Sequence, residues 1–460
     1  MQKGQLVMIV EFALNATLQR ILVNVRSNSF SVTIDEATIY NFDAIGRLLG
    51  AYRGGKNYLR GLDNRVLVKW GGGHGLANRS RRDLSEDEKR AFFDEMQQTL
   101  LGIVQALRAG QITPIGERDC PPTQPFARVE THQDVTLLSW EEGSAVGDIW
   151  LHVADVLSSA WGYEQLCADG TRFRTIYKPV SILPPDQYLA LVLQATEGCS
   201  WNKCTFCNFY RDRPFHIKGD DEFRQHIRAI RDFFGPALSL RTTVFLADAN
   251  ALVIPQERLL RLFDIVNAEL PIVPARLSNG ERKAWSAAHP TALRGVYSFV
   301  DAFTIRHKSV EDYHELAERN LRRAYIGLES GDDNLLRFLH KGNTAEDARQ
   351  AVATIKAGGV DVGVILMLGV GGRRFYDAHV RHSIDVVNAM RLGERDILYF
   401  SPFFDYPGSE YARLAAELGI EPLTGQEMDA QMAAIRAGLR FADAQRRPKI
   451  AIYDIREFIY

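Results

Sequence analysis

Three cysteines stand close together in the stretch "TEGCSWNKCTFCNFYRDRPF", which covers residues 196–215. Four residues separate Cys199 from Cys204, and two separate Cys204 from Cys207. Thiolates this close in sequence can converge on one centre through short turns alone, so the stretch indicates a metal site. Three interpretations are open here: an iron–sulfur cluster, a zinc site, or small residues of a buried core.

Each interpretation makes a different demand on the surrounding sequence. A structural zinc site needs four closed ligands, and His216 is the candidate for the fourth. Burial in a core would need apolar neighbours, whereas "SWNK" and "NFYRDR" around the cysteines are polar and charged. A [4Fe-4S] cluster held by three cysteines leaves one iron with open positions for a small molecule. Three thiolates, rather than four, therefore favour the cluster.

The composition is that of an ordinary globular protein. Of the 460 residues, 46% are hydrophobic and 24% are charged, and the formal net charge is -2, so neither nucleic acid nor a membrane is expected as a partner. Glu11 interrupts the apolar run near the start and no cleavage site follows it, so we predict no signal peptide. Five cysteines are too few, and odd in number, for a disulfide framework; we expect a cytoplasmic protein.

Short apolar runs alternate with amphipathic helical segments from about residue 186 onward. This rhythm predicts an α/β fold with a parallel sheet, because parallel neighbours need a crossover connection, usually a helix. An open doubly wound sheet and a partial barrel both fit. The predicted strands cover residues 191–196, 243–248, 296–302, 324–329, 363–369 and 397–402, and the predicted helices cover 222–234, 256–270, 310–321 and 346–359.

Polar residues and glycines follow directly after these predicted strands. They are Glu197 to Cys207, Asp248 to Asn250, Asp301, Glu329 with Ser330, Gly369 to Gly372, and Ser401. Ligands of such sheets bind at the carboxyl ends of the strands. We therefore expect these residues to lie at one edge, together with the cysteines.

The segments on either side differ in character. In residues 1–185, the runs between 29 and 70 predict an antiparallel meander, and Ser85 with Glu88 forms a capping box that begins a helix to about Leu107. The cluster "LPPDQY" at 183–188 marks the start of the next domain. After residue 410 we predict a helical extension, whose aromatic end "AIYDIREFIY" either docks on the core or lines the substrate cavity.

Taken together, these motifs resemble the radical S-adenosylmethionine (SAM) superfamily over about residues 190–410. Phe206 precedes the third cysteine, as an aromatic residue usually does there, although the usual triad has three residues, not four, between its first two cysteines. "FLADANAL" (245–252) and "VILMLGVGG" (364–372) are similar to cofactor-binding segments of the family. "YIGLESGDDNLL" (325–336) resembles the branch that contains oxygen-independent coproporphyrinogen oxidase and the methylthiotransferases.

The resemblance implies a partial (βα)6 TIM-like barrel over residues 186–410, between an N-terminal α+β domain (1–185) and a C-terminal helical cap (411–460). It implies that Cys199, Cys204 and Cys207 hold a 4Fe-4S cluster that cleaves SAM reductively. The resulting 5'-deoxyadenosyl radical would abstract hydrogen from a small-molecule substrate, and a flavodoxin or ferredoxin would donate the electron. The implied contacts to SAM are Phe206, Asn208, Asp248, Asn250, Glu329, Ser330, Leu368 and Gly369.

Several other features leave the reaction open. Phe209 and Tyr210 either wall the adenine or pack in the core. Cys120 and Cys167 stand apart, so no auxiliary cluster is expected, and His132 lacks the glycine that a cobalamin-binding motif would place after it. The basic runs at 78–82 and 445–449 are interpreted as solvated loop charge. Two other functions stay open: a haem-carrying protein on the same fold and a zinc-structured binding protein.

Overall fold

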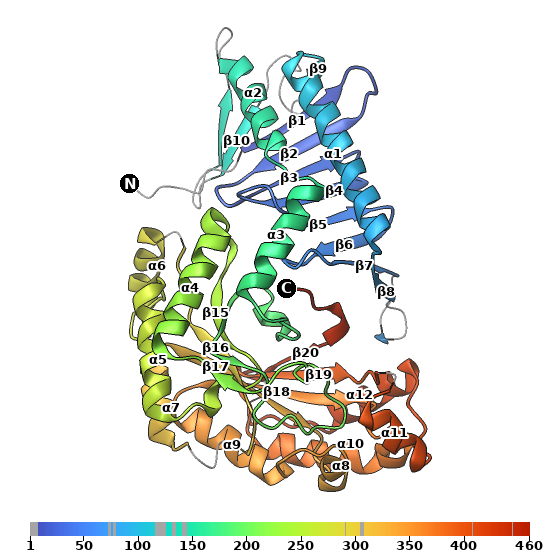
Figure 1. The fold of residues 1–460 in the computed structure, drawn as a ribbon, viewed down its shortest axis with the longest axis vertical. Coiled ribbons are helices and arrows are strands. Elements are labelled where there is room, and N and C mark those ends of the chain that lie inside the picture. Colours follow the sequence, from blue (N-terminus) through green and yellow to red (C-terminus); the bar gives the residue numbers. More distant parts are fainter. Residues whose placement is uncertain are drawn as a thin grey trace.

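Two sheets organise the chain in the computed structural model, an antiparallel one near the N-terminus and a parallel one after it (Figure 1). The structure describes residues 8–71, 75–76, 80–115, 126–130, 135–139, 145–289, 291–303, 308–406, 408–443 and 445–460. Cys120, His132 and the first two residues of the basic run at 78–82 lie outside these ranges.

The N-terminal sheet is an antiparallel meander of nine strands in the order β8-β7-β6-β5-β4-β3-β2-β1-β9. Its strands alternate buried and less buried residues, as expected when one face packs on a core. The predicted meander between residues 29 and 70 is confirmed by β3 to β7. The strands are β1 Met8–Leu14, β2 Arg20–Val25, β3 Ser29–Ile34, β4 Thr38–Asp43, β5 Leu48–Arg53, β6 Lys56–Arg60, β7 Val66–Trp70, β8 Ser80–Asp83 and β9 Ile112–Pro114.

Helices cover one face of this sheet. They are α1 Glu86–Arg108, α2 Ala145–Ser158 and α3 Tyr163–Ile176. The predicted capping box of Ser85 and Glu88 is present at the start of α1, and it satisfies backbone N–H groups that have no partner inside the helix. Phe93 and Met96 of α1 are fully buried against the sheet. A separate hairpin pairs β10 Phe126–Glu130 with β11 Val135–Ser139.

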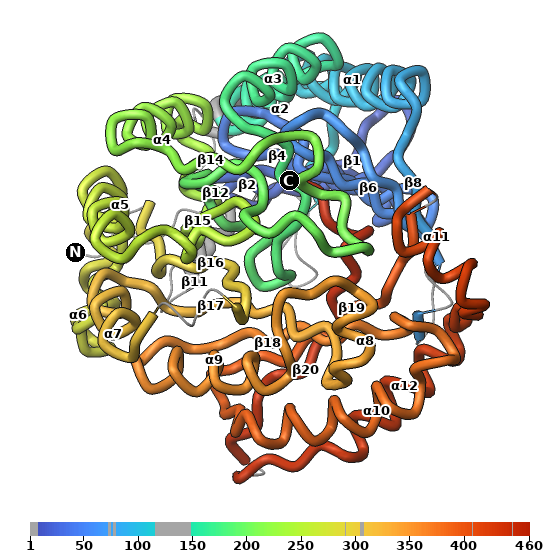
Figure 2. The backbone as a smooth tube through the Cα atoms, turned by 60° about the horizontal axis from the view of Figure 1, so that its bottom comes forward, coloured from blue at the N-terminus to red at the C-terminus, as the bar shows by residue number. Residues whose placement is uncertain are grey.

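The second sheet has seven parallel strands in chain order, β12-β15-β16-β17-β18-β19-β20. Its helices lie around the outside of the curved sheet (Figure 2). This arrangement confirms the predicted α/β fold of partial TIM-barrel type. The strands are β12 Ala190–Gln194, β15 Thr243–Ala247, β16 Val296–Val300, β17 Leu321–Glu329, β18 Asp361–Leu368, β19 Ile397–Pro402 and β20 Lys449–Ile452. The helices are α4 Asp220–Phe234, α5 Gln256–Glu269, α6 Asn279–Ala288, α7 Val310–Glu318, α8 Asp333–Phe338, α9 Ala345–Ala357, α10 Gly372–Ala389, α11 Glu410–Glu417 and α12 Gly425–Gly438.

The seventh strand departs from the six that the sequence predicts. Strand β20 pairs in parallel with β19, from Ile397 opposite Lys449 to Phe400 opposite Ile452. The segment that we expected to be a helical cap therefore also supplies an edge strand. The prediction missed it because "KIAI" is four residues long and begins with a lysine, which is too short for a pattern of alternation.

After β20 the chain crosses to the other edge of the parallel sheet. The Tyr460 hydroxyl accepts a hydrogen bond from the Val192 N–H (3.0 Å) and donates one to the Ala190 carbonyl (3.2 Å), both in β12. The backbone carbonyl of Tyr460 accepts a hydrogen bond from Leu62 of the N-terminal region (2.7 Å). The C-terminus thus lies between the two sheets (Figure 1) and covers part of the edge of β12.

The buried Arg47 also joins the two regions. The guanidinium of Arg47, which is 1% exposed, donates two hydrogen bonds to Asp169 of α3 (2.9 and 2.7 Å) and one to the carbonyl of Phe233 in α4 (2.8 Å). Two parallel hydrogen bonds fix the relative position of guanidinium and carboxylate.

Among the described residues, no helix is long and apolar enough to cross a bilayer.

Candidate functional site

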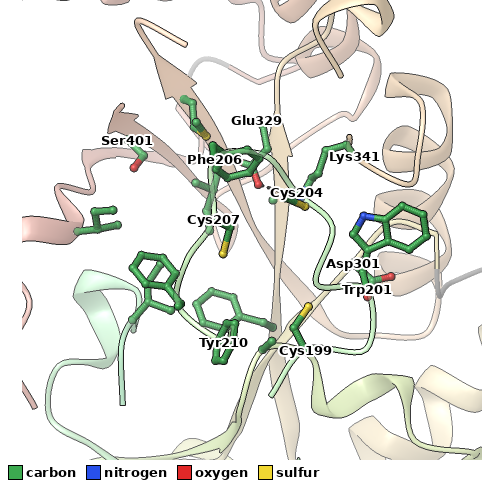
Figure 3. Close-up of a pocket in the computed structure, with 18 of the residues that line it drawn as sticks. Cys199, Trp201, Cys204, Phe206, Cys207, Tyr210, Asp301, Glu329, Lys341 and Ser401 are labelled. Carbon is green, nitrogen blue, oxygen red and sulfur yellow. Dashed lines mark hydrogen bonds and ion pairs between the residues drawn. The ribbon is translucent and has the colours of Figure 1, made fainter. Parts of the chain in front are cut away.

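A cavity opens at the carboxyl ends of the parallel strands, where the sequence predicted a site. It encloses about 1180 Å³ of empty space, with its open mouth included. Cys199, Cys204 and Cys207 all line it, together with Glu329 and Lys341 (Figure 3). Ligand pockets of roughly 300–1,000 Å³ bury a drug-sized molecule, so this cavity has room for more than one small group.

The cysteines lie on a loop that a short antiparallel pair closes. Strand β13 (Thr196–Glu197) pairs with β14 (His216–Ile217). Gly198 begins the loop at φ +76°, and a Cβ there would lie 2.8 Å from the Pro214 carbonyl oxygen, so a side chain does not fit. The Arg211 guanidinium donates hydrogen bonds to the carbonyls of Cys204 (3.0 Å) and Cys207 (3.1 Å). The loop is therefore held from within, between the two flanking strands.

Asn202 accommodates the additional residue between the first two cysteines. Its φ of +48° is a left-handed conformation that asparagine tolerates better than most residues. Its N–H donates to the Cys199 Sγ (3.3 Å), and its side-chain amide donates to the Tyr210 carbonyl (3.3 Å). The Trp201 indole donates to the His340 carbonyl (2.9 Å). The four-residue spacing is thus taken up by one tight turn tied to Cys199.

The three cysteines are free, and burial favours the protonated form of two of them. Burial raises the pKa of the Cys204 thiol, and it raises the pKa of Cys207 to about 12. A cationic metal centre reverses this balance, because a coordinating thiol loses its proton. The cavity thus offers three thiols that ionise when a metal centre binds.

The arrangement suits a cluster better than a single ion. Among the described residues, no group of three or more His, Cys, Asp or Glu side chains could hold one metal ion. His216, the candidate fourth ligand for zinc, instead contacts Glu222 (3.1 Å) and is exposed. In a 4Fe-4S cluster each cysteine binds a different iron, so the three sulfur atoms need not meet at one point. Three cysteines around one cavity fit that requirement.

Glu329 and Lys341 form a half-enclosed ion pair in the cavity. Lys341 Nζ lies 2.9 Å from Glu329 Oε1, and the two side chains are 12% and 11% exposed. Burial disfavours the charged form of Lys341, but the negative charge of Glu329 and the Cys204 sulfur outweigh it and raise the lysine pKa. Glu329 has φ +59°, and the pairing of β17 with β18 shifts between Gly327 and Glu329. This β-bulge turns the carboxylate into the site.

Two further predicted contacts, Phe206 and Asn250, also line the cavity. The Asn250 amide donates a hydrogen bond to the Asp301 carboxylate, and Asp301 lines the cavity as well. Phe209 and Tyr210 are part of the wall too. Residues from the ends of β15, β16 and β17 thus meet the cysteine loop at one edge, as the strand pattern predicted.

Asp248 occupies a different place, beneath the cysteine loop. Its carboxylate accepts hydrogen bonds from the Gln194 side chain (3.2 Å), the Gly198 N–H (3.3 Å) and the Arg213 guanidinium (3.1 Å). Burial raises the Asp248 pKa, against the opposing effect of the Arg213 charge. In this structure Asp248 holds the start of the loop, and its role as a SAM contact stays a prediction.

The remaining predicted contacts also lie outside the cavity lining. Ser330 is fully buried and shares a hydrogen bond with His379 (2.8 Å). Leu368 is fully buried, and Asn208 is exposed on the loop. The Gly369 N–H donates to Gln431 of α12 (2.8 Å). The glycines after β18 thus allow α11 and α12 to approach the strand closely, and their contact with the adenine stays a prediction.

Several residues of the site escaped the sequence analysis. Lys341 follows the six-residue helix α8 and carries no motif, so only its position in space reveals it. Aromatic side chains form much of the wall, and "PFFDY" at residues 402–406, which begins with the last residue of β19, was a usable signal for part of it. The aromatic lining residues are Trp201, Phe206, Phe209, Tyr210, Phe299, Phe303, Phe403, Phe404, Tyr406 and Tyr453.

The aromatic end of the chain does both things that the sequence left open. Tyr460 is buried against β12, while Tyr453 and Ile455 line the cavity. Because Tyr460 fixes the end of the tail to β12, residues a few positions earlier in the tail are held at the cavity.

Comparison with known proteins agrees with this geometry. Residues 193–386 match the sequence model of the radical SAM superfamily. A search of curated proteins returned no match.

Among solved structures, the chain is similar to the cobalamin-dependent S-adenosylmethionine radical enzyme OxsB (14% identity, TM-score 0.34), with 56% of this chain and 33% of that chain covered. It is also similar to coproporphyrinogen III oxidase (HemN) from Escherichia coli (12%, 0.37; 54% and 51% covered) and to the radical S-adenosylmethionine methyltransferase TsrM from Kitasatospora setae (16%, 0.36; 60% and 58% covered).

The chain thus spans about a third of the length of OxsB, and none of these three similarities reaches a TM-score of 0.5. The assignment therefore depends on the family match, together with the parallel barrel and the cysteine loop at its edge. On these grounds the chain carries a radical SAM domain over residues 193–386.

Proposed function

We propose that this enzyme holds a 4Fe-4S cluster on Cys199, Cys204 and Cys207 and uses SAM to abstract a hydrogen atom from a small-molecule substrate. One observation carries the proposal: all three cysteines line a single cavity at the carboxyl edge of the barrel. With SAM bound, such a cluster supplies one electron that cleaves SAM into methionine and a 5'-deoxyadenosyl radical.

The chain's own residues position and shield this chemistry. Arg211 and Asn202 fix the cysteine loop, and the Glu329 carboxylate provides a hydrogen-bond acceptor for the cofactor. The aromatic walls exclude water, which protects a radical from quenching. Lys341 orients the Glu329 carboxylate through a hydrogen bond of 2.9 Å.

The proposed electron donor is a flavodoxin or ferredoxin that docks on the outer side of the cysteine loop. Lys203 and Arg211 are exposed there. Positive charge at the rim speeds association with an acidic donor, and salt screens this effect. The proposed compartment is the cytoplasm, where reducing conditions keep free thiols available.

Anaerobic reconstitution tests the proposal. The purified chain should take up about four iron and four sulfide per molecule and should release 5'-deoxyadenosine from SAM when reduced. Omission of SAM and omission of the reductant are the controls. A chain that binds four irons but never cleaves SAM, with or without cell metabolites, would contradict the proposed reaction. One zinc per chain without iron or sulfide would instead select the zinc-structured alternative.

A further inference from the structure

Part of the cavity wall comes from segments outside the family match. The match ends at residue 386, and the wall continues with Pro402 at the end of β19, with Phe403, Phe404 and Tyr406 after it, and with Tyr453 and Ile455 after β20. We call these six residues the outer wall. They carry no formal charge, and four of the six are aromatic. A surface of this kind favours contact with apolar, flat groups.

Packing orders the outer wall before any ligand binds. The Phe403 N–H donates to the Leu368 carbonyl (2.8 Å), and its ring lies edge-on to Tyr411 with centroids 4.5 Å apart. The Phe404 and Tyr406 rings lie edge-on to one another at 5.4 Å, and Phe404 is 38% exposed. A half-exposed ring at the rim of an apolar wall gains contact area when a flat ligand covers it.

The charges in the cavity disfavour an anion. Apart from the cysteines, its charged lining residues are Asp301, Glu329 and Lys341, and Lys341 is already paired with Glu329. At the rim, the Arg456 guanidinium lies 5.1 Å from the Phe404 ring but makes two hydrogen bonds to Asp454. A carboxylate or phosphate would thus enter without a new cationic partner and would lose its hydration.

Tyr406 and Tyr453 carry the two hydroxyl groups of the outer wall, and Tyr453 offers a hydrogen bond. Its side chain is 1% exposed and lines the cavity, and its hydroxyl has no hydrogen-bond partner among the described residues. Burial raises the pKa of Tyr453, so the hydroxyl keeps its proton and remains a donor. A buried donor without a partner costs free energy unless a ligand or a water accepts its proton.

We infer that the outer wall binds the substrate of the proposed radical reaction, and that this substrate is a flat aromatic compound without negative charge that accepts a hydrogen bond from Tyr453. The inference rests on the proposed function, because only that function makes the bound compound a substrate of the 5'-deoxyadenosyl radical. The binding preference itself is a property of the outer wall.

Three matched probes test this preference by titration calorimetry of the reconstituted chain with excess SAM: 2-acetylnaphthalene, 2-naphthoate and 2-ethylnaphthalene. The neutral acceptor should bind at least about tenfold more tightly than the anion, which corresponds to about 1.4 kcal/mol. Phe404→Ala should weaken both neutral probes about tenfold. Tyr453→Phe should weaken 2-acetylnaphthalene about fivefold and leave 2-ethylnaphthalene unchanged, since one net hydrogen bond is worth about 1 kcal/mol.

Leu418→Ala is the matched control, because Leu418 is 46% exposed and does not line the cavity. It should bind all three probes as the wild type does. Equal or tighter binding of 2-naphthoate would overturn the inference, and so would a Phe404→Ala variant that binds like the wild type. None of the six outer-wall residues is a cysteine, so the outer wall does not need the cluster in order to bind the probes. The same titration on the iron-free chain therefore distinguishes failure of the proposed function from failure of this inference. A normal preference without SAM cleavage refutes the proposed function alone, and SAM cleavage without the preference refutes this inference alone.

Discussion

The two walls of the cavity differ in chemistry and in origin. The inner wall, which we define as Cys199, Cys204, Cys207, Glu329 and Lys341, carries the sulfur atoms and an ion pair, and it lies within the residues that match the superfamily. The outer wall lies outside the match and is aromatic and uncharged. Under the proposed function, the inner wall would generate the radical, and the outer wall would select the substrate that the radical meets.

The supports of the two walls differ as well. The inner wall is held by hydrogen bonds within the cysteine loop and to the loop after α8, such as the one from the Thr205 N–H to the Leu339 carbonyl (3.1 Å). Two outer-wall residues, Tyr453 and Ile455, lie on the C-terminal tail after β20, and the N-terminal region holds this tail by ion pairs. Arg81 of β8 pairs with Asp454, and Lys69 of β7 pairs with Glu457. We therefore expect damage to the inner wall to abolish chemistry and damage to the tail to alter substrate binding.

Loss of a cysteine should break the inner wall completely. Cys207→Ala removes one of the proposed cluster ligands, so iron uptake should fall several-fold and 5'-deoxyadenosine release should fall below detection. Iron analysis and chromatography of the reduced reaction mixture measure both. Cys167→Ala is the matched control, because Cys167 lies on α3 and its sulfur accepts a hydrogen bond from Asn64 (3.3 Å) away from the cavity. Equal iron content in the two variants would contradict the assignment.

Removal of the lysine should weaken the inner wall without removing a ligand. Lys341→Met leaves the Glu329 carboxylate without its cation, and breaking a buried ion pair costs about 3–5 kcal/mol in the free energy of unfolding. Urea denaturation of the iron-free chain measures this loss. The double variant Glu329→Gln, Lys341→Met removes both charges and should recover most of the stability. A single variant as stable as the wild type would show that the pair is solvated.

Acid should destabilise the strand that carries Met367 to the cavity. His379 accepts a hydrogen bond from Ser330 and donates one to the Met367 carbonyl (2.9 Å), and burial lowers its pKa from 6.5 to about 4. The folded state thus holds His379 neutral, while the unfolded state takes up a proton below pH 6.5. The stabilisation is complete above pH 6.5 and declines toward pH 4 by about 3 kcal/mol in total.

Denaturation midpoints measured from pH 7 to pH 4 check this dependence. His379→Gln removes the titrating group, so its stability should fall less steeply over the same range. Parallel pH profiles for the two proteins would refute the role of His379.

The smallest effect is expected at the end of the chain. Tyr460→Phe removes the hydroxyl that bonds to Val192 and Ala190, which should lower the free energy of unfolding by about 1–2 kcal/mol. Because the tail carries Tyr453 and Ile455, the variant should also weaken binding of 2-acetylnaphthalene while iron uptake stays normal. Tyr52→Phe is the control, since Tyr52 is 38% exposed in the N-terminal sheet. Reduced iron uptake in Tyr460→Phe would show that the two walls are coupled.

The sequence by itself predicted the cysteines and Glu329 of the inner wall and the plan of the fold. Local spacing predicted the cysteine loop, and the alternation of apolar runs with helices predicted the six main strands, since both signals act over a few residues. The same signals placed Asn250, Glu329 and the cysteines at one edge. They also placed Asp248, Ser330 and Gly369 there, but the structure holds these three residues outside the cavity lining by hydrogen bonds. The hydrogen-bond partners lie 49 to 62 positions away in the chain, except for one partner of Asp248, which lies 35 positions away.

Only the tertiary structure decided which other residues complete the cavity. Strand β20 is too short to show a pattern, Lys341 belongs to no motif, and Tyr453 reaches the cavity because Tyr460, seven residues later, is fixed to β12. The bond from Val192 to Tyr460 spans 268 positions of the chain, and the pairing of Ile397 in β19 with Lys449 in β20 spans 52. Local sequence determines periodicity and turns, but contacts over such separations depend on how the two sheets and the tail pack together.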